Sequence, residues 1–432
     1  MNLQEISRAV ESGIMIIFTD FLAEISRLPV YDTHEHFMPE SELLAHPPDF
    51  FDLLFPYVCD DLMSAGMSVD ELKSLRDRNL SFHRRWAIFE LYYSYVRHGS
   101  YFRALHKSLT AMGMSDFDEA GAMALSGYLS EHCKIGCYQK MAAELGIIKT
   151  NVILDDYRLV KGYDSERFVC IPTLSMFCPA NRSDISRIED ICHQPVKELL
   201  DLDKALENLF LDYENQNIHA IKLGSAYVRE LDFKEGDPVA AAKVLSELKN
   251  GLACRKNSLQ LDEKIVDFEQ IKPLDDYLIW KILTLAQLKK FDVHIHTGLH
   301  AWNYNVPTRC HADSLHHIIS SFPNIRFVLL HAGIPYIEDA LLLAKYYPNV
   351  ILNLTWTHII DRVKTQELIE RILEMIPVNK VQGFGGDYLY PQSVRGSLEM
   401  ARENIAAVLY KKIVAKEMTH AEALQIAASW FC

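Results

Sequence analysis

Short apolar runs rich in β-branched residues recur along the whole chain, and longer amphipathic stretches separate them. Continuous apolar strands that alternate with helices are typical of a parallel sheet covered by helices. Eight such runs favour an α/β fold of the (β/α)8 TIM-barrel type over an open sheet. The predicted strands are residues 28–31, 150–154, 168–174, 218–223, 293–296, 326–331, 350–354 and 381–384.

The length of the chain exceeds what a bare barrel needs. Of the 432 residues, about 250 suffice for the eight βα units. The surplus lies in residues 37–147, after the first strand, and in residues 224–292, after the fourth strand. Both segments are rich in helical patterns and leave from strand carboxyl ends, where barrel active sites lie. We therefore predict one barrel spanning residues 1–432, with two large helical insertions that shape a pocket.

Composition narrows the class of partner. The chain carries 44 Lys+Arg and 58 Asp+Glu, a net charge of −14, which argues against nucleic acid or an anionic membrane as its partner. No apolar stretch reaches about 18 residues, and the amino end lacks the basic segment of a signal peptide. The nine scattered cysteines form no CxxC pair, which favours reduced thiols over a disulfide framework. These features predict a cytoplasmic protein that binds a small molecule.

Two closely spaced histidines follow the first predicted strand. Residues i and i+2 of a strand point to the same side, so His34 and His36 should both face the barrel interior. Two imidazoles at this spacing can bind one divalent metal, typically zinc. The 18 histidines of the chain give about 0.75 HxH pairs by chance, and His294 and His296 form a second pair. The spacing alone is therefore weak evidence.

The positions of several polar residues strengthen the prediction. Lys222, His296, His331 and Asp387 lie at or just after the ends of predicted strands four, five, six and eight, as His36 does after strand one. Carboxyl ends of barrel strands converge on one site, so these side chains can meet across the fold. The sequence thus predicts a metal-dependent active site at this end of the barrel.

As a set, six segments resemble the amidohydrolase superfamily, in the "amidohydrolase 2" branch related to aminocarboxymuconate-semialdehyde decarboxylase and uronate isomerase-like TIM-barrel enzymes. They are YDTHEHF, IKLGSAYVREL, VHIHTGL, FVLLHAGIPY, PNVILNLTW and FGGDY, which run from residue 31 to about residue 390. The resemblance implies a divalent metal, zinc before manganese, iron or nickel, as one or two ions. Its ligands would be His34, His36, His296 and Asp387, with His296 preferred over His294 because it directly precedes Thr297-Gly298.

The same resemblance implies catalytic roles for Asp387, His331 and Lys222. His331 would be a second-metal ligand or an acid/base that stabilises developing charge. Lys222 would be a carbamylated bridge between two metals, or an uncarbamylated cation for a substrate carboxylate. A bound divalent metal lowers the pKa of water to as little as about 7, and Asp387 would take the proton as general base.

The leading expectation is a metal-dependent hydrolase of a small, carboxylated substrate. A non-oxidative decarboxylase or a uronate-isomerase-like enzyme on the same metal site is the alternative. A non-enzymatic scaffold is disfavoured, because a scaffold has no chemical need for the His/His/His/Asp set. The aromatic-rich segment 82–105 of the first insertion suggests core packing or a homodimer contact. The expected substrate-binding residues follow strands four, five and seven: Tyr227, Arg229, Trp302, Arg309, Trp356 and His358.

Overall fold

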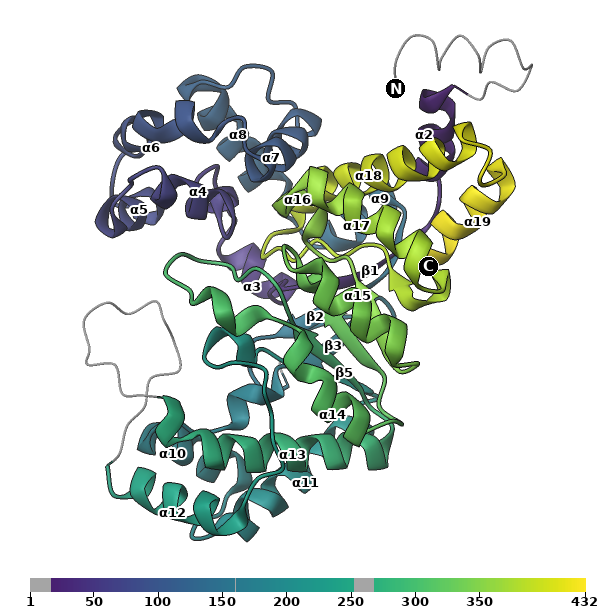
Figure 1. The fold of residues 1–432 in the computed structure, drawn as a ribbon. Helices are drawn as coiled ribbons and strands as arrows, with labels where there is room; N and C mark the ends of the chain where they lie inside the picture. Colours follow the sequence, from purple (N-terminus) through teal and green to yellow (C-terminus); the bar gives the residue numbers. More distant parts are fainter. Residues whose placement is uncertain (1–16, 160, 252–267) are drawn as a thin grey trace.

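The computed structural model describes residues 17–159, 161–251 and 268–432. Within these residues, eight strands form two parallel sheets, in the orders β1-β2-β3 and β4-β5-β6-β7-β8 (Figure 1). The strands are β1 Val30–Glu35, β2 Ile147–Leu154, β3 Phe168–Pro172, β4 Ala220–Leu223, β5 Asp292–His296, β6 Phe327–Leu330, β7 Val350–Asn353 and β8 Val381–Gln382.

Backbone contacts join the two sheets at both of their edges. Thr173, just after β3, forms a parallel bridge with Lys222 of β4. On the other side, the backbone N–H of Thr33 donates to the carbonyl of Phe384 at 3.1 Å. The strands therefore close into a ring, and the predicted α/β barrel is confirmed as a barrel-like fold.

The first strand lies later in the chain than predicted. It covers residues 30–35 and not residues 28–31, so His34 lies inside β1 and His36 just beyond it. Asp32, His34 and Glu35 are fully buried although they are polar. The prediction searched for apolar runs and therefore ended this strand before Asp32, the first charged residue. It missed the second half of the strand, whose buried side chains are polar.

Most helices of the chain amino-terminal to β4 lie between β1 and β2. Figure 1 shows α4 to α8 gathered in one group of helices, apart from α10 to α13 at the other end of the view. The helices up to β4 are α2 Phe18–Ser26, α3 Glu40–Ala45, α4 Val58–Ser64, α5 Val69–Arg76, α6 Phe82–Val96, α7 Ser100–Ala111, α8 Glu119–His132, α9 Cys137–Leu145, α10 Arg182–Cys192 and α11 Leu199–Asn215. The stretch 82–105, expected as one helical pattern, is broken before α7, where Gly99 takes an extended conformation (φ −63°, ψ 158°).

The remaining helices follow β4 to β8. They are α12 Pro238–Lys249, α13 Lys272–Lys289, α14 His316–Ser321, α15 Ile337–Tyr346, α16 Thr357–Ile360, α17 Arg362–Met375, α18 Val394–Val414 and α19 His420–Phe431. The predicted insertions 37–147 and 224–292 are thus helix-rich where the structure describes them. That they are insertions into a single barrel domain stays a prediction.

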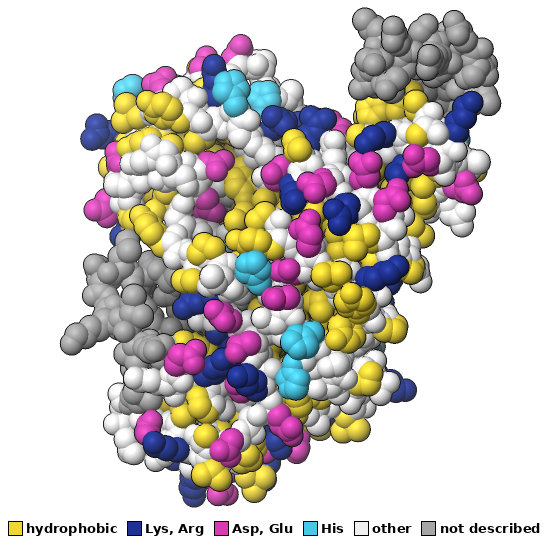
Figure 2. Space-filling view, viewed as in Figure 1, with side chains coloured by type: hydrophobic (Ala, Val, Ile, Leu, Met, Phe, Trp, Pro, Cys, Tyr) yellow, Lys and Arg dark blue, Asp and Glu magenta, His cyan; other side chains and the backbone are white. Residues whose placement is uncertain are grey.

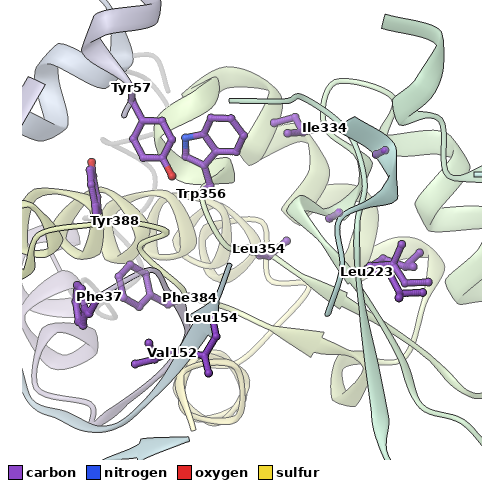
Figure 3. Close-up of a cluster of buried hydrophobic side chains, with 14 of the residues drawn as sticks. Phe37, Tyr57, Val152, Leu154, Leu223, Ile334, Leu354, Trp356, Phe384 and Tyr388 are labelled. Carbon is purple, nitrogen blue, oxygen red and sulfur yellow. The ribbon is translucent and has the colours of Figure 1, made fainter. Parts of the chain in front are cut away.

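Aromatic side chains join the helices that follow β1 to the barrel. Tyr57, which directly precedes α4, stacks on Trp356 after β7 with ring centroids 4.8 Å apart (Figure 3). Tyr57 also stacks on Tyr101 of α7 at 5.3 Å. Stacked rings add to the free energy gained by burying their area, so this contact fixes the helical segment against the carboxyl ends of the strands.

The eight cysteines in the described part of the chain form no disulfide with one another, and Cys254 lies outside that part. Among the described helices, none combines the length and the apolar character needed to cross a membrane. On the face seen in Figure 2, acidic and basic side chains are interspersed with apolar ones.

Candidate active site

Three of the predicted metal ligands meet at the carboxyl end of the barrel. The Nε2 atoms of His34 and His36 each lie 3.3 Å from Oδ1 of Asp387. One ligand atom from each of the three residues lies within 4.8 Å of the others. His34 is fully buried, and 11% of the Asp387 side chain is exposed. The cluster is therefore mostly buried.

Two glycines let the chain after β8 approach β1 closely enough to form this cluster. A Cβ on Gly385 would lie 2.1 Å from Oγ1 of Thr355, and one on Gly386 would lie 2.1 Å from Oε1 of Glu35. Asp387 then turns through a left-handed conformation (φ 63°), and its backbone N–H donates to the carbonyl of His34 at 2.9 Å. Such a conformation is costly for a non-glycine residue and occurs mostly where function requires it.

The chemistry of these three residues fits a divalent metal. Burial, and then the charge of Lys222, lowers the pKa of His34 well below its ordinary value, so this imidazole is neutral, as a metal ligand must be. Burial opposes ionisation of Asp387, but the adjacent imidazoles of His34 and His36 still hold its pKa well below the usual range. Two imidazoles and a carboxylate are a donor set for Zn²⁺, and they also suit Mn²⁺, Fe²⁺ or Ni²⁺.

Lys222 is in contact with the same cluster. Its Nζ lies 3.3 Å from Nε2 of His34 and 3.2 Å from Nε2 of His36. Burial lowers the pKa of this lysine. The strand-end prediction therefore places Lys222 correctly beside the two histidines.

His296 and His331 pair with each other next to the cluster. Nε2 of His331 lies 3.1 Å from Nδ1 of His296 and 3.8 Å from Oδ2 of Asp387. Nε2 of His296 lies 3.0 Å from the carbonyl of Leu299 and must donate to it. Both ring nitrogens of His296 are thus engaged away from His34 and His36, and its role as a fourth ligand stays a prediction. His294, the other histidine of the pair, is also buried, and burial lowers its pKa to about 3.

A pocket of about 350 Å³ opens above the cluster, a size typical of small-molecule sites. The lining includes hydroxyl-bearing residues and also apolar ones such as Trp302 and Leu389. The lining residues are His36, Pro56, Tyr57, Asp155, Thr173, Ser175, Met176, Lys222, Gly224, Ser225, Tyr227, Val228, Asp275, His296, Ala301, Trp302, Asp387 and Leu389.

Two of the six expected substrate-binding residues line this pocket. Tyr227 stacks on His296 with ring centroids 4.7 Å apart, and Trp302 is fixed by donation of its backbone N–H to Asp60 of α4 at 2.8 Å. Arg309 is not among the lining residues. Trp356 and His358 are about 1% exposed and pack beneath the site. His358 contacts the carbonyl of Gly383 at 2.9 Å, which is a structural role.

Arg229 does not line the pocket, contrary to the expectation that it would clamp a carboxylate. Its guanidinium is buried and pairs with Asp275 and Asp276 at 2.7 Å each and with Asp232 at 3.3 Å. The positive charge of Arg229, which the sequence suggested would bind a substrate carboxylate, is therefore paired with aspartates of the protein itself. A sequence pattern cannot reveal this, because Asp275 and Asp276 lie on α13, more than 40 residues away.

Replacing Arg229 by Met is expected to reduce the free energy of unfolding by roughly 3–5 kcal/mol, because it leaves buried carboxylates without a partner. Denaturant titration monitored by circular dichroism measures this change. Arg326→Met is the matched control, since Arg326 is half-exposed and pairs with Asp292 at the surface, where the loss should be at most about 1 kcal/mol. Equal losses of unfolding free energy in the two variants would contradict the conclusion that Arg229 forms a buried, structural ion pair.

Two residues of the site were missing from the sequence prediction. Tyr57 lies in the segment between β1 and β2, and its hydroxyl donates to the backbone carbonyl of Asp387. No strand-end signal points to it. Asp155 directly follows β2, so the rule that found the other strand-end residues applies to it as well.

The chain thus combines a barrel-like α/β fold with a His/His/Asp cluster at the strand carboxyl ends. Residues 264–408 match the family model of the amidohydrolases. Over 163 residues, or 36% of this chain, the sequence is 27% identical to Protein fluG of Emericella nidulans, and this match spans about a fifth (19%) of that protein.

Solved structures of similar fold cover nearly the whole chain. A uronate isomerase from Thermotoga maritima has a TM-score of 0.75 at 13% identity, over 95% of this chain and 94% of that chain. A glucuronate isomerase from Caulobacter crescentus has a TM-score of 0.73 at 16% identity, over 96% and 92%. A Lactobacillus casei protein assigned as a metal-dependent hydrolase has a TM-score of 0.61 at 13% identity, over 95% of each chain.

These findings confirm the resemblance to the amidohydrolase superfamily, with a uronate isomerase-like fold. The amidohydrolase model matches residues 264–408, and the cluster of His34, His36 and Asp387 has the donor set for a divalent metal.

Proposed function

We propose that this protein is a metal-dependent isomerase of a small sugar acid, with His34, His36 and Asp387 as the metal ligands. The observation that carries this proposal is the pocket, which places a buried lysine and several hydroxyl groups beside the His/Asp cluster. The uronate isomerases that share the fold over nearly the whole chain support the choice of reaction.

The pocket wall suits a substrate with many hydroxyl groups and one carboxylate. Thr173, Ser175, Ser225 and Tyr227 contribute hydroxyls, which can both donate and accept hydrogen bonds. Lys222 contributes an ammonium group that can pair with a carboxylate. Trp302 adds an apolar ring to the lining.

The reaction requires the movement of protons but no oxidant and no water. In the conversion of an aldehyde sugar acid to its ketone isomer, one proton leaves C2 and one is added at C1, while a proton moves between the two oxygens. A divalent metal, when bound, polarises a substrate oxygen. The ionised Asp387 is placed to accept a proton, and Tyr57 holds it in position through the backbone carbonyl.

The test is an assay of the metal-loaded enzyme with D-glucuronate and D-galacturonate, followed by ¹H NMR. The expected result is loss of the aldehyde form, growth of a keto sugar acid and, in D2O, deuterium at the receiving carbon. Parallel samples with N-acyl amino acids and lactones report hydrolysis by release of an amine or acid, and a CO2 assay reports decarboxylation. Turnover in these parallel assays with no keto sugar formed would overturn the isomerase proposal.

Hydrolysis of a small carboxylated substrate, with Asp387 as general base, is the second candidate. It is favoured by the approach of His331 to Oδ2 of Asp387 at 3.8 Å, which places a base and a second proton-carrying group side by side. It is also favoured by the amidohydrolase match over residues 264–408. A small molecule is the proposed ligand in both cases, and a homodimer remains a separate proposal.

Lys222→Met tests which role the lysine has. As the cation for the substrate carboxylate, its loss should raise KM roughly tenfold or more, because a charge-assisted hydrogen bond is lost. The metal content, measured by inductively coupled plasma mass spectrometry, should not change. A substrate analogue without the carboxylate is the control, and its KM should be insensitive to the substitution. A fall from two bound ions to one would instead support the carbamylated bridge.

A further inference from the structure

Asp155 is a carboxylate of the pocket for which the proposed reaction has no role. It directly follows β2, and 76% of its side chain is exposed. Its Oδ1 lies 2.9 Å from Nδ1 of His36. The neighbouring strands account for this placement, because the last residue of β1, Glu35, pairs with Val152 of β2, so the segments that follow the two strands leave the barrel at the same end.

We propose that Asp155 is a positioning residue that orients His36 for metal binding, an inference that rests on the metal centre of the proposed function. A carboxylate at Nδ1 keeps the proton of a neutral imidazole on that nitrogen. The lone pair of Nε2 then points away from Asp155. That Nε2 atom is the one that lies 3.3 Å from Oδ1 of Asp387. A carboxylate behind a ligating histidine also makes the imidazole a stronger ligand.

The two histidines of the cluster differ in their need for such a partner. His34 is fully buried, and its Nδ1 has no hydrogen-bond partner among the described residues. On its Nδ1 side, the His34 ring is therefore held by packing and not by a hydrogen bond. His36 faces the pocket with 15% of its side chain exposed, so packing restrains its ring on fewer sides. Asp155 supplies the missing restraint at the more exposed ligand.

The experiment compares metal affinity in the full-length wild-type protein and three variants. After removal of metal, the Kd for Zn²⁺ and for Mn²⁺ is measured by competition with a chromogenic chelator. Asp155→Ala should raise Kd by about 10- to 100-fold, the usual loss when the partner of a ligating histidine is removed. Asp155→Asn should lose much less, because the amide oxygen still accepts a hydrogen bond from Nδ1–H.

Asp156→Asn is the matched control. It removes a negative charge one residue away, but its carboxylate pairs with Arg158 and Arg187 at 2.7 Å each and not with a histidine. Its Kd should stay within about twofold of wild type, because only screened long-range charge is changed.

A Kd in Asp155→Ala equal to that of wild type would overturn the inference, as would equal losses in Asp155→Ala and Asp156→Asn. These results leave the proposed function intact, because the wild-type protein still binds metal in both. A wild-type protein that binds neither ion would overturn the metal centre itself. Because the readout is metal affinity, the outcome does not depend on which reaction the enzyme catalyses.

Discussion

Replacing Asp387 by Asn is expected to lower kcat by about 10²- to 10⁴-fold, the range typical for loss of an acid/base group. The amide has nearly the same shape, so the bond from the Asp387 backbone to the His34 carbonyl and the turn after β8 can persist. It cannot accept a proton at neutral pH, and it brings no negative charge to the two imidazoles. Steady-state kinetics on the preferred substrate, together with the bound-metal content, measures the effect.

Asp313→Asn is the control for this substitution, since Asp313 is an exposed carboxylate outside the pocket lining. Its kcat should equal that of wild type. The melting temperature of Asp387→Asn shows whether the protein is still folded. A folded Asp387→Asn variant whose kcat lies within threefold of wild type would rule out Asp387 as the acid/base group.

Removal of metal is expected to abolish turnover and also to lower stability. A ligand present at 100 times its Kd, and bound only by the folded state, stabilises that state by about 2.7 kcal/mol. Treatment with a chelator should therefore lower the melting temperature, and added Zn²⁺ or Mn²⁺ should restore both the temperature and the activity. Differential scanning calorimetry and the activity assay give two independent readouts.

His36→Ala is the companion variant. It should show no stabilisation by added metal, because one of the three donor atoms that lie within 4.8 Å of one another is lost. His83→Ala removes an exposed histidine that pairs with Glu119 at 3.0 Å, outside any candidate metal group of the described residues, and the response to metal should be unchanged. If metal stabilised His36→Ala as much as wild type, the cluster would not be the metal site.

Strand positions were largely predictable from the sequence, and the first strand shows where that reasoning fails. The parallel strands β5, β6 and β7 lie within one residue of the predicted bounds, because buried β-branched residues mark each of them, although two histidines interrupt the apolar residues of β5. β1 was predicted to begin two residues and to end four residues too early, because its second half is polar and becomes buried only through the site that it helps to form.

In the candidate site, too, the sequence predicted what depends on local position in the chain and missed contacts between residues far apart in the chain. Position at a strand end was enough to bring His34, His36 and Asp387 together in the prediction, since parallel strands share one carboxyl edge. Arg229 also follows a strand, but acids from a distant helix pair with it, so it does not serve the pocket. Contacts between residues far apart in the chain, such as Arg229 with these aspartates, leave no periodic pattern in the sequence from which they could be predicted.

The amino-acid sequence by itself determined the alternation of strands and helices, and with it the convergence of His34, His36 and Asp387 at one end of a barrel. Both follow from local hydrophobic pattern and from the geometry of parallel strands. Only the tertiary structure decided that Asp155 contacts His36, that His296 turns toward His331, and that Arg229 is held by acids. These outcomes depend on side-chain distances of about 3 Å between elements that only folding brings into contact.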